Sequence, residues 1–108
     1  LMFGLGGIFV EVFKDVIFRL APIGRNEARR MVRGIKGYAV LDGYRGKPPV
    51  DGELLERLLV SLSDMALNHP EIKELDINPL VAYEKGKGAV VADSRMILEP
   101  PREDPASS

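Results

Sequence analysis

The stretch ELDINPLVAYEKGKGAVVADSRM, residues 74–96, decides the fold of this 108-residue chain. Two runs rich in β-branched and aromatic residues flank a short turn of lysine and glycine, which predicts an antiparallel hairpin. With Lys85 and Gly86 as the central turn residues, positions whose numbers sum to 171 face each other across the strands. Asn78 and Asp93 are then direct cross-strand neighbours, with Cβ atoms about 5 Å apart.

Oxygen donors gather on one face of this hairpin. Because side chains alternate along a strand, Asp76 shares the face of Asn78, one step along. Carboxylate and carboxamide oxygens without His or Cys suit Mg²⁺, which proteins often hold with one or two carboxylates plus nucleotide phosphates. The same residues also fit a polar hairpin face exposed to water, and a three-residue turn would put Asn78 and Asp93 on opposite faces. The residues alone leave both alternatives open.

A second hairpin is predicted near the start of the chain. The runs 8–13 and 16–20 are rich in β-branched and aromatic residues, and Lys14-Asp15 separates them as a two-residue break. In this register, positions whose numbers sum to 29 face each other.

Two amphipathic helices are predicted between the hairpins. The first covers residues 26–35, where apolar residues recur at helical spacing, and Gly37 suits its left-handed stop. The second follows Asp51, whose carboxylate caps the first turn, and ends at His69 before a proline. Its apolar stripe contains Leu54, Leu55, Leu58, Leu59, Leu62, Met65 and Ala66. Its outward side contains Glu53, Glu56, Arg57, Ser61 and Asp64.

The order of these elements, β-β-α-α-β-β, predicts an α+β fold. One antiparallel sheet would carry both helices on one face. The segment 37–49 has glycines and paired prolines without a strong period, and it is predicted as a loop.

Composition narrows the class of protein. Fifteen Lys+Arg against sixteen Asp+Glu give a net charge of −1, which argues against a nucleic-acid partner. The absence of cysteine excludes a disulfide framework and a thiolate metal site. No apolar run approaches the roughly 20 residues of a membrane helix, and no signal peptide pattern is present. We expect a cytoplasmic domain, or a piece of one, with neither a membrane nor a nucleic acid as partner.

The two ends of the chain differ in character. Residues 1–5 are apolar, which suggests a chain cut from something longer or one that packs on a partner. Residues 99–108 read EPPREDPASS, which is typical of a linker or a disordered tail. We therefore expect one structural unit over residues 1–98, followed by a Pro-rich tail over 99–108.

Three blocks of the sequence resemble a known family. They are MFGLGGIFVEVFKDVIFRLAPI (2–23), IKGYAVLDGYRGKPPVD (35–51) and PEIKELDINPLVAYEKGKGAVVADSRM (70–96). In this order they closely resemble the C-terminal part of the ATP-grasp domain of ADP-forming acyl-CoA synthetases, including the beta subunit of ADP-forming acetyl-CoA synthetase. Multi-domain protein acetyltransferases of similar build carry the same module. The succinyl-CoA synthetase beta chain is more distantly similar.

The resemblance implies roles for several residues. The Asn of the INPL motif and an Asp on the following strand bind the nucleotide's Mg²⁺ in this family, which implies Asn78 and Asp93. Asp76 matches the acidic position before that Asn. The hairpin register pairs Asn78 with Asp93 independently of this resemblance. Gly6 and Gly7 suit a backbone approach to phosphate, with a tight turn as the alternative.

Arg19 and Glu11 are further candidates in the same module. An arginine near a transferring phosphoryl group would stabilise developing charge, and a surface arginine is the alternative. Arg19 faces Val10 in the predicted register, so Glu11 and Arg19 lie on opposite faces unless a one-residue bulge joins them.

The implied activity belongs to a larger assembly. The parent would be an acid–CoA ligase that converts acyl-CoA, ADP and phosphate into acid, CoA and ATP, with phosphoryl transfer between nucleotide and an enzyme histidine. The upstream ATP-grasp subdomain and a CoA-binding alpha subunit or domains would be partners, and ATP/ADP and Mg²⁺ the cofactors. This chain alone would be inactive. The alternatives are a non-catalytic α+β interaction or regulatory module, or the ATP-grasp part of a protein acetyltransferase.

Overall fold

The computed structural model describes residues 1–7 and 12–100. The first four residues of the predicted strand 8–13, Glu11 among them, lie outside the described residues, as does most of the predicted tail. None of the described helices is long and apolar enough to cross a membrane.

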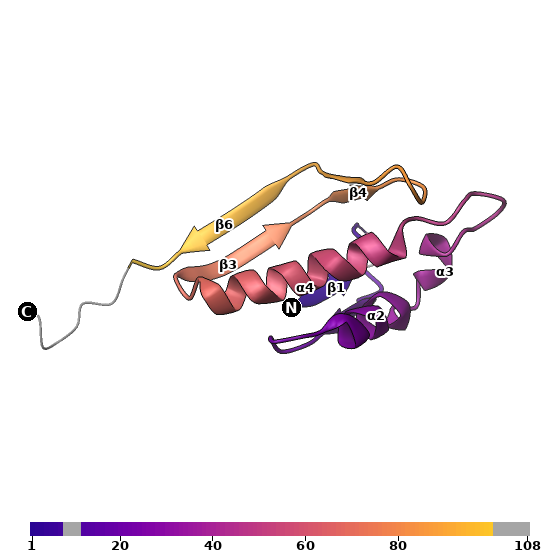
Figure 1. The fold of residues 1–108 in the computed structure, drawn as a ribbon. Helices are drawn as coiled ribbons and strands as arrows, with labels where there is room; N and C mark the ends of the chain where they lie inside the picture. The colour runs from indigo at the N-terminus through magenta and orange to yellow at the C-terminus, as the bar shows by residue number, and fades with distance from the viewer. Residues whose placement is uncertain (8–11, 101–108) are drawn as a thin grey trace, which may run out of the picture.

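The elements alternate between strand pairs and helices along the chain (Figure 1). Their bounds are β1 (Met2–Gly4), β2 (Val16–Phe18), α2 (Arg25–Gly34), α3 (Tyr38–Leu41), α4 (Gly52–Asn68), β3 (Ile72–Ile77), β4 (Leu80–Ala82), β5 (Ala89–Val91) and β6 (Ser94–Leu98). All strand pairs are antiparallel. The predicted α+β class with two main helices is confirmed. In place of one continuous sheet, the described residues form the two-stranded ribbons β1–β2, β3–β6 and β4–β5.

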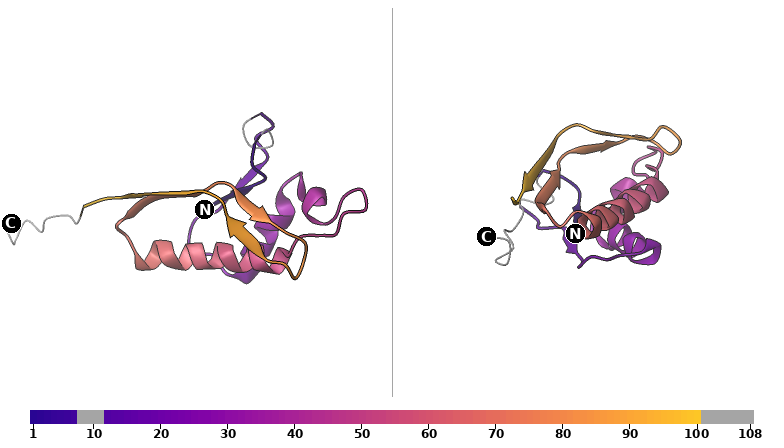
Figure 2. Two further views of the ribbon diagram at one scale, coloured as in Figure 1. Left: turned by 90° about the horizontal axis from the view of Figure 1, so that it is seen from above. Right: turned by 60° about the vertical axis from the view of Figure 1, so that its left-hand side comes forward.

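Helix α4 lies between the long β3–β6 hairpin and helix α2, as both the front view and the end-on view show (Figures 1 and 2). The predicted N-cap is confirmed, because Asp51 Oδ1 accepts a hydrogen bond from the Leu54 N–H at 3.1 Å. The helix also ends as predicted at His69. The prediction of a loop over residues 37–49 is wrong in part, because residues 38–41 form the short helix α3.

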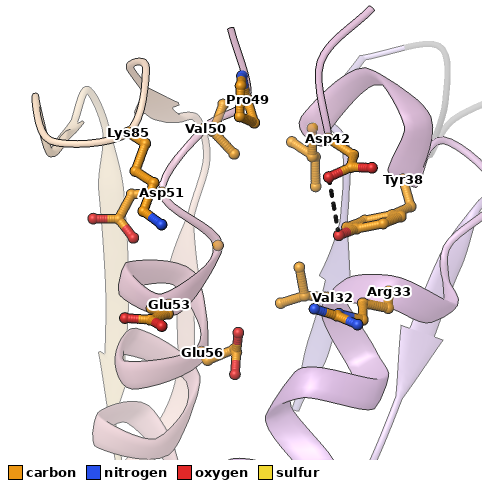
Figure 3. A pocket seen from close by; sticks show the side chains of 12 residues that line it. Val32, Arg33, Tyr38, Asp42, Pro49, Val50, Asp51, Glu53, Glu56 and Lys85 are labelled. Atoms are coloured by element: carbon orange, nitrogen blue, oxygen red, sulfur yellow. Dashed lines mark hydrogen bonds between the residues drawn. The ribbon is translucent and has the colours of Figure 1, made fainter.

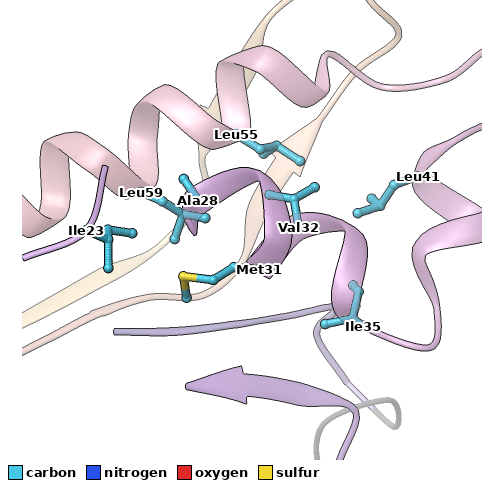
Figure 4. Close-up of a cluster of buried hydrophobic side chains, with 8 residues drawn as sticks. All are labelled: Ile23, Ala28, Met31, Val32, Ile35, Leu41, Leu55 and Leu59. Carbon is cyan, nitrogen blue, oxygen red and sulfur yellow. The ribbon is translucent and has the colours of Figure 1, made fainter. Parts of the chain in front are cut away.

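The hydrophobic core lies at the interface of α2 and α4 (Figure 4). Its buried members are Ile23, Ala28, Met31, Val32, Ile35, Leu41, Leu55 and Leu59. The expectation that Glu56 faces away from the core is wrong, because Glu56 is buried at this interface and pairs with Arg25 at 3.8 Å. Ser63 is fully buried as well, and its hydroxyl accepts a hydrogen bond from the Ile23 N–H at 2.9 Å.

The N-terminal ribbon differs from the predicted hairpin. β2 pairs with β1, in a register that places Phe3 opposite Ile17, so the predicted turn at Lys14-Asp15 is wrong. Asp15 is buried instead, and its carboxylate accepts hydrogen bonds from the N–H groups of Lys36 and Gly37 at 2.6 and 2.7 Å. These charge-assisted bonds fix the segment before β2 to the end of α2.

Gly37 has a role other than the predicted left-handed stop. Its φ is −79°, and helix α2 ends at Ile35 in extended geometry. A Cβ at Gly37 would lie 2.6 Å from Leu5 Cδ1 and 3.2 Å from Asp15 Oδ2. A larger residue at this position would therefore require the Leu5 side chain to shift.

The C-terminal hairpin follows the predicted register. Val81 pairs with Val90 and Leu75 with Met96, so the sum of 171 holds through both ladders until an irregularity between Ile72 and Glu74. Lys85 and Gly86 are the central turn residues, because the Lys87 N–H donates to the Glu84 carbonyl at 2.9 Å. Gly86 adopts the left-handed φ of +93° that this turn requires.

Candidate metal and nucleotide site on the long hairpin

Asn78 and Asp93 lie at the junction between the two ladders of the hairpin. The Asn78 N–H donates to the Asp93 carbonyl at 3.0 Å, and the Ala92 N–H donates to the Pro79 carbonyl at 3.0 Å. The predicted cross-strand pairing of Asn78 and Asp93 is therefore present in the structure. Both residues are exposed, so their side-chain oxygens are open to an incoming ligand.

The glycine segment Gly6-Gly7 near the start of the chain lies beside Asn78. A Cβ built on Gly6 would lie 3.5 Å from Asn78 Oδ1, so the Gly6 backbone lies against the Asn78 side chain. Gly7 adopts a left-handed φ of +65°, a conformation that suits glycine. The structure thus brings together two predicted site segments that are far apart in the sequence.

Asp76 lies one step along the same strand face. It is exposed and stands opposite Arg95 in the β3–β6 ladder. Among residues 1–7 and 12–100, no three or more His, Cys, Asp or Glu side chains are grouped so that they could hold a metal ion. The hairpin therefore presents one carboxamide and one carboxylate side by side, with a second carboxylate, Asp76, one step along the strand, and a complete ligand set would need oxygens from water or phosphate.

Arg19 lies at the far end of the N-terminal ribbon from Gly6. It pairs with Leu1 through reciprocal backbone hydrogen bonds, whereas Gly6 follows the other end of β1. Arg19 Nε donates to Glu27 Oε1 at 2.5 Å, and an Arg19 Nη donates to the Phe18 carbonyl at 2.7 Å. The hydrogen bond from Arg19 is the main cause that lowers the pKa of Glu27. The structure does not bring Arg19 to the Asn78–Asp93 pair.

A separate cavity of about 220 Å³ opens between α2, α3 and the start of α4 (Figure 3). Glu53 and Asp51 line its α4 side with Lys85, while Tyr38 and Asp42 line the other side. The Tyr38 hydroxyl donates to Asp42 Oδ1 at 3.5 Å. None of the predicted site residues lines this cavity, so it is distinct from the hairpin site.

His69 closes helix α4, as expected. Its backbone N–H donates to the Met65 carbonyl, and its Nδ1 lies 3.1 Å from Glu71 Oε1. The pKa of Glu71 is lowered, first by a hydrogen bond from its own backbone N–H and then by His69.

Comparison with known proteins identifies the class of domain to which this chain belongs. The family model of the ATP-grasp domain matches residues 1–98, and the chain belongs to this family. Among curated proteins, it is 55% identical over 97 residues to the acetate–CoA ligase (ADP-forming) I subunit beta of Pyrococcus furiosus, a match covering 90% of this chain and 41% of that protein. It is 49% identical to the acetate–CoA ligase (ADP-forming) I of Archaeoglobus fulgidus, a match covering 91% of this chain and 14% of that protein.

A solved structure has the same fold. The dinucleotide-forming acetyl-coenzyme A synthetase 1 of Candidatus Korarchaeum cryptofilum, in complex with coenzyme A and Mg-AMPPCP, matches with a TM-score of 0.84 and 45% identity. That match covers 91% of this chain and 45% of the solved chain. This chain thus spans less than half the length of the relatives that it matches.

Proposed function

We propose that this chain supplies the metal-binding wall of the nucleotide site in an ATP-grasp module of an ADP-forming acyl-CoA ligase. One observation carries the proposal: the cross-strand pair Asn78 and Asp93 presents two exposed oxygen ligands beside the glycine backbone at Gly6. Family membership and the relatives' names support the ligase assignment.

The donor set fits a hard divalent cation that shares its ligands with phosphate. Asn78 Oδ1 and the Asp93 carboxylate would hold Mg²⁺, with Asp76 as the next carboxylate along the strand. A bound Mg²⁺ neutralises charge on the phosphoryl oxygens during transfer. The N–H groups of Gly6 and Gly7 would position the phosphates. A phosphate contact by Arg19 stays a prediction, and it requires the hydrogen bond to Glu27 to open.

The full reaction requires more than this chain. Acyl-CoA, ADP and phosphate would give acid, CoA and ATP, with the phosphoryl group passing between nucleotide and a histidine of another part of the enzyme. The remaining part of the ATP-grasp module and a CoA-binding subunit or domain would supply the rest of the site. Positioning and charge neutralisation are the contribution of Asn78 and Asp93.

The test uses a chimera that restores the missing part. In the Pyrococcus furiosus subunit beta, the matching stretch is replaced by this chain, and the subunit is combined with the rest of its enzyme. Asp93→Ala is expected to abolish ATP-dependent turnover and to weaken Mg·ATP binding at least tenfold, as measured by titration calorimetry. Glu74→Ala, an exposed carboxylate on strand β3 of the same hairpin, is the matched control and should leave both unchanged.

Two outcomes would contradict this assignment. Equal Mg·ATP affinity in the Asp93→Ala and Glu74→Ala chimeras would remove Asp93 from the metal site. Loss of the folded state in Asp93→Ala, seen by circular dichroism, would make Asp93 structural. A titration of the isolated chain with Mg·ADP, followed by amide chemical shifts, shows in addition whether Asn78 and Asp93 bind Mg·ADP without the rest of the module.

A further inference from the structure

Arg95 lies on the same face of the long hairpin as the proposed metal site. In the β3–β6 ladder it stands directly opposite Asp76. Residues that face each other across two antiparallel strands project to the same side of the sheet, and side chains two positions apart on one strand share a side as well. Arg95 is therefore on the side that carries Asp76 and Asn78, and the Asn78 N–H donates to the Asp93 carbonyl.

The Arg95 guanidinium is not engaged with the carboxylate that it faces. Oppositely charged residues that stand across a ladder stabilise a sheet when they pair. Within the part of the chain that the structure describes, however, no ion pair joins Arg95 to Asp76 or to any other carboxylate. Arg95 is exposed, so its fork of N–H donors is open to a ligand that arrives from solvent.

The other cations of the hairpin are placed less well for this site. Lys87 forms an ion pair beside the turn, and Lys85 lines the separate cavity of Figure 3. Lys73 lies near the start of β3, at the end away from the turn. Arg19, which the sequence offers as a phosphate contact, is held in an ion pair with helix α2. Among the described residues, Arg95 is therefore the cation that the fold places beside the proposed metal ligands.

Charge balance assigns Arg95 a ligand. The carboxylates of Asp76 and Asp93 together cancel the charge of Mg²⁺, so the metal and its protein ligands alone would not compensate the charge of a nucleotide's phosphates. We propose that Arg95 binds the phosphate oxygens of the nucleoside di- or triphosphate whose phosphates also ligate the metal. This inference rests on the proposed function and adds a substrate contact to it. Arginine suits this contact because its planar fork donates parallel hydrogen bonds to one phosphate group.

The experiment separates phosphate binding from metal binding in the chimera with the Pyrococcus furiosus subunit. Titration calorimetry measures the affinity for Mg·ATP. Electron paramagnetic resonance measures the affinity for Mn²⁺ alone, which suits the same oxygen ligands as Mg²⁺. Arg95→Gln should weaken Mg·ATP binding about tenfold, because charge-assisted hydrogen bonds to phosphate are lost. Mn²⁺ should bind at least as tightly as before, because the substitution removes a positive charge that repels the metal.

Two further variants complete the comparison. Arg57→Gln removes the same charge from an exposed position on α4 and should leave both affinities unchanged. Arg95→Lys keeps the charge without the planar fork, so its Mg·ATP affinity should lie between those of the unmodified chimera and Arg95→Gln. Equal Mg·ATP affinity in Arg95→Gln and Arg57→Gln would overturn the proposal. Equal losses of Mn²⁺ and Mg·ATP affinity in Arg95→Gln would also overturn it, because Arg95 would then act on the metal ligands.

Failure of this inference is distinguishable from failure of the proposed function. If Arg95→Gln weakens Mg·ATP binding while Asp93→Ala leaves Mn²⁺ binding unchanged, the phosphate contact is correct and the metal site is wrong. If Asp93→Ala loses both Mn²⁺ and Mg·ATP binding while Arg95→Gln loses neither, the metal site is correct and the phosphate contact is wrong.

Discussion

The α2–α4 interface and the C-terminal hairpin differ in how deeply their side chains are buried. Among the described residues, every buried hydrophobic side chain belongs to the segment from Ile23 to Leu59, and none belongs to the hairpin. The hairpin instead presents Asn78 and Asp93 to solvent. Stability is therefore concentrated in one region, and the residues proposed to bind the metal lie in another.

This division has a consequence for substitution. Removing a buried group costs transfer free energy and leaves a cavity or an unpaired polar atom, whereas an exposed side chain contributes little to stability. Substitutions of the same residue type at a buried and at an exposed position therefore test this difference in stability.

Met31→Ala has the largest expected effect on stability. Met31 is fully buried between α2 and the rest of the core, so its truncation should lower the free energy of unfolding by about 2–5 kcal/mol. Met96→Ala removes the same atoms from β6, where the side chain is 48% exposed, and should cost less than about 1 kcal/mol. Urea denaturation measures both. If both variants lost similar amounts of unfolding free energy, the Met96 side chain would be as well packed as that of Met31.

Asp15→Ala should follow in size. The substitution leaves the N–H groups of Lys36 and Gly37 without their acceptor. Both bonds are only partly buried, so water replaces part of the about 1.5–3 kcal/mol that a hydrogen bond to a charged group contributes. We expect a clear loss of unfolding free energy in the same denaturation experiment. Asp76→Ala, on the exposed side of the hairpin, is the control and should stay within about 0.5 kcal/mol of the unmodified chain. If Asp15→Ala left the free energy of unfolding unchanged, contacts other than the Asp15 hydrogen bonds would hold β2 in place.

Ser63→Ala is expected to cost about 1–3 kcal/mol, because the Ile23 N–H loses its buried acceptor. Ser61→Ala is a matched control on the exposed side of the same helix, and both variants gain the same helix propensity. The difference between their unfolding free energies isolates the hydrogen bond. No difference would mean that water replaces the hydroxyl at Ile23.

Local information was enough to predict the hairpin. The turn around Lys85 and Gly86 sets the register for both ladders, so the pairing of Asn78 with Asp93 follows from residues close in sequence. The approach of Gly6 to Asn78 could not be predicted in this way, because it depends on how the ribbon packs against the hairpin.

Tertiary contacts overrode the local pattern in the ribbon and in α4. Lys14-Asp15 has the spacing of a turn, but the buried hydrogen bonds of Asp15 hold that segment to α2, and β2 pairs with β1. Helix α4 lies between α2 and the hairpin, and its buried residues are Leu55, Glu56, Leu59 and Ser63. Glu56 lies at the margin of the apolar stripe, and no sequence periodicity distinguishes such a position from an exposed one.

The smallest expected effect concerns the ion pair that joins the end of β2 to α2. Arg19 lowers the pKa of Glu27 through its hydrogen bond, so Glu27 is more acidic in the folded chain than in the unfolded one. The stabilisation is therefore present above the unfolded pKa and is lost as the pH falls through the lowered folded pKa. Arg19→Gln should lower the melting temperature slightly at neutral pH, less than Ser63→Ala does, and the deficit should vanish in acid. High salt should shrink it, because exposed charges are screened. Arg29→Gln, on the exposed side of α2, should show no such pH dependence. A deficit that persists in acid would assign the effect to side-chain packing of Arg19 rather than to its charge.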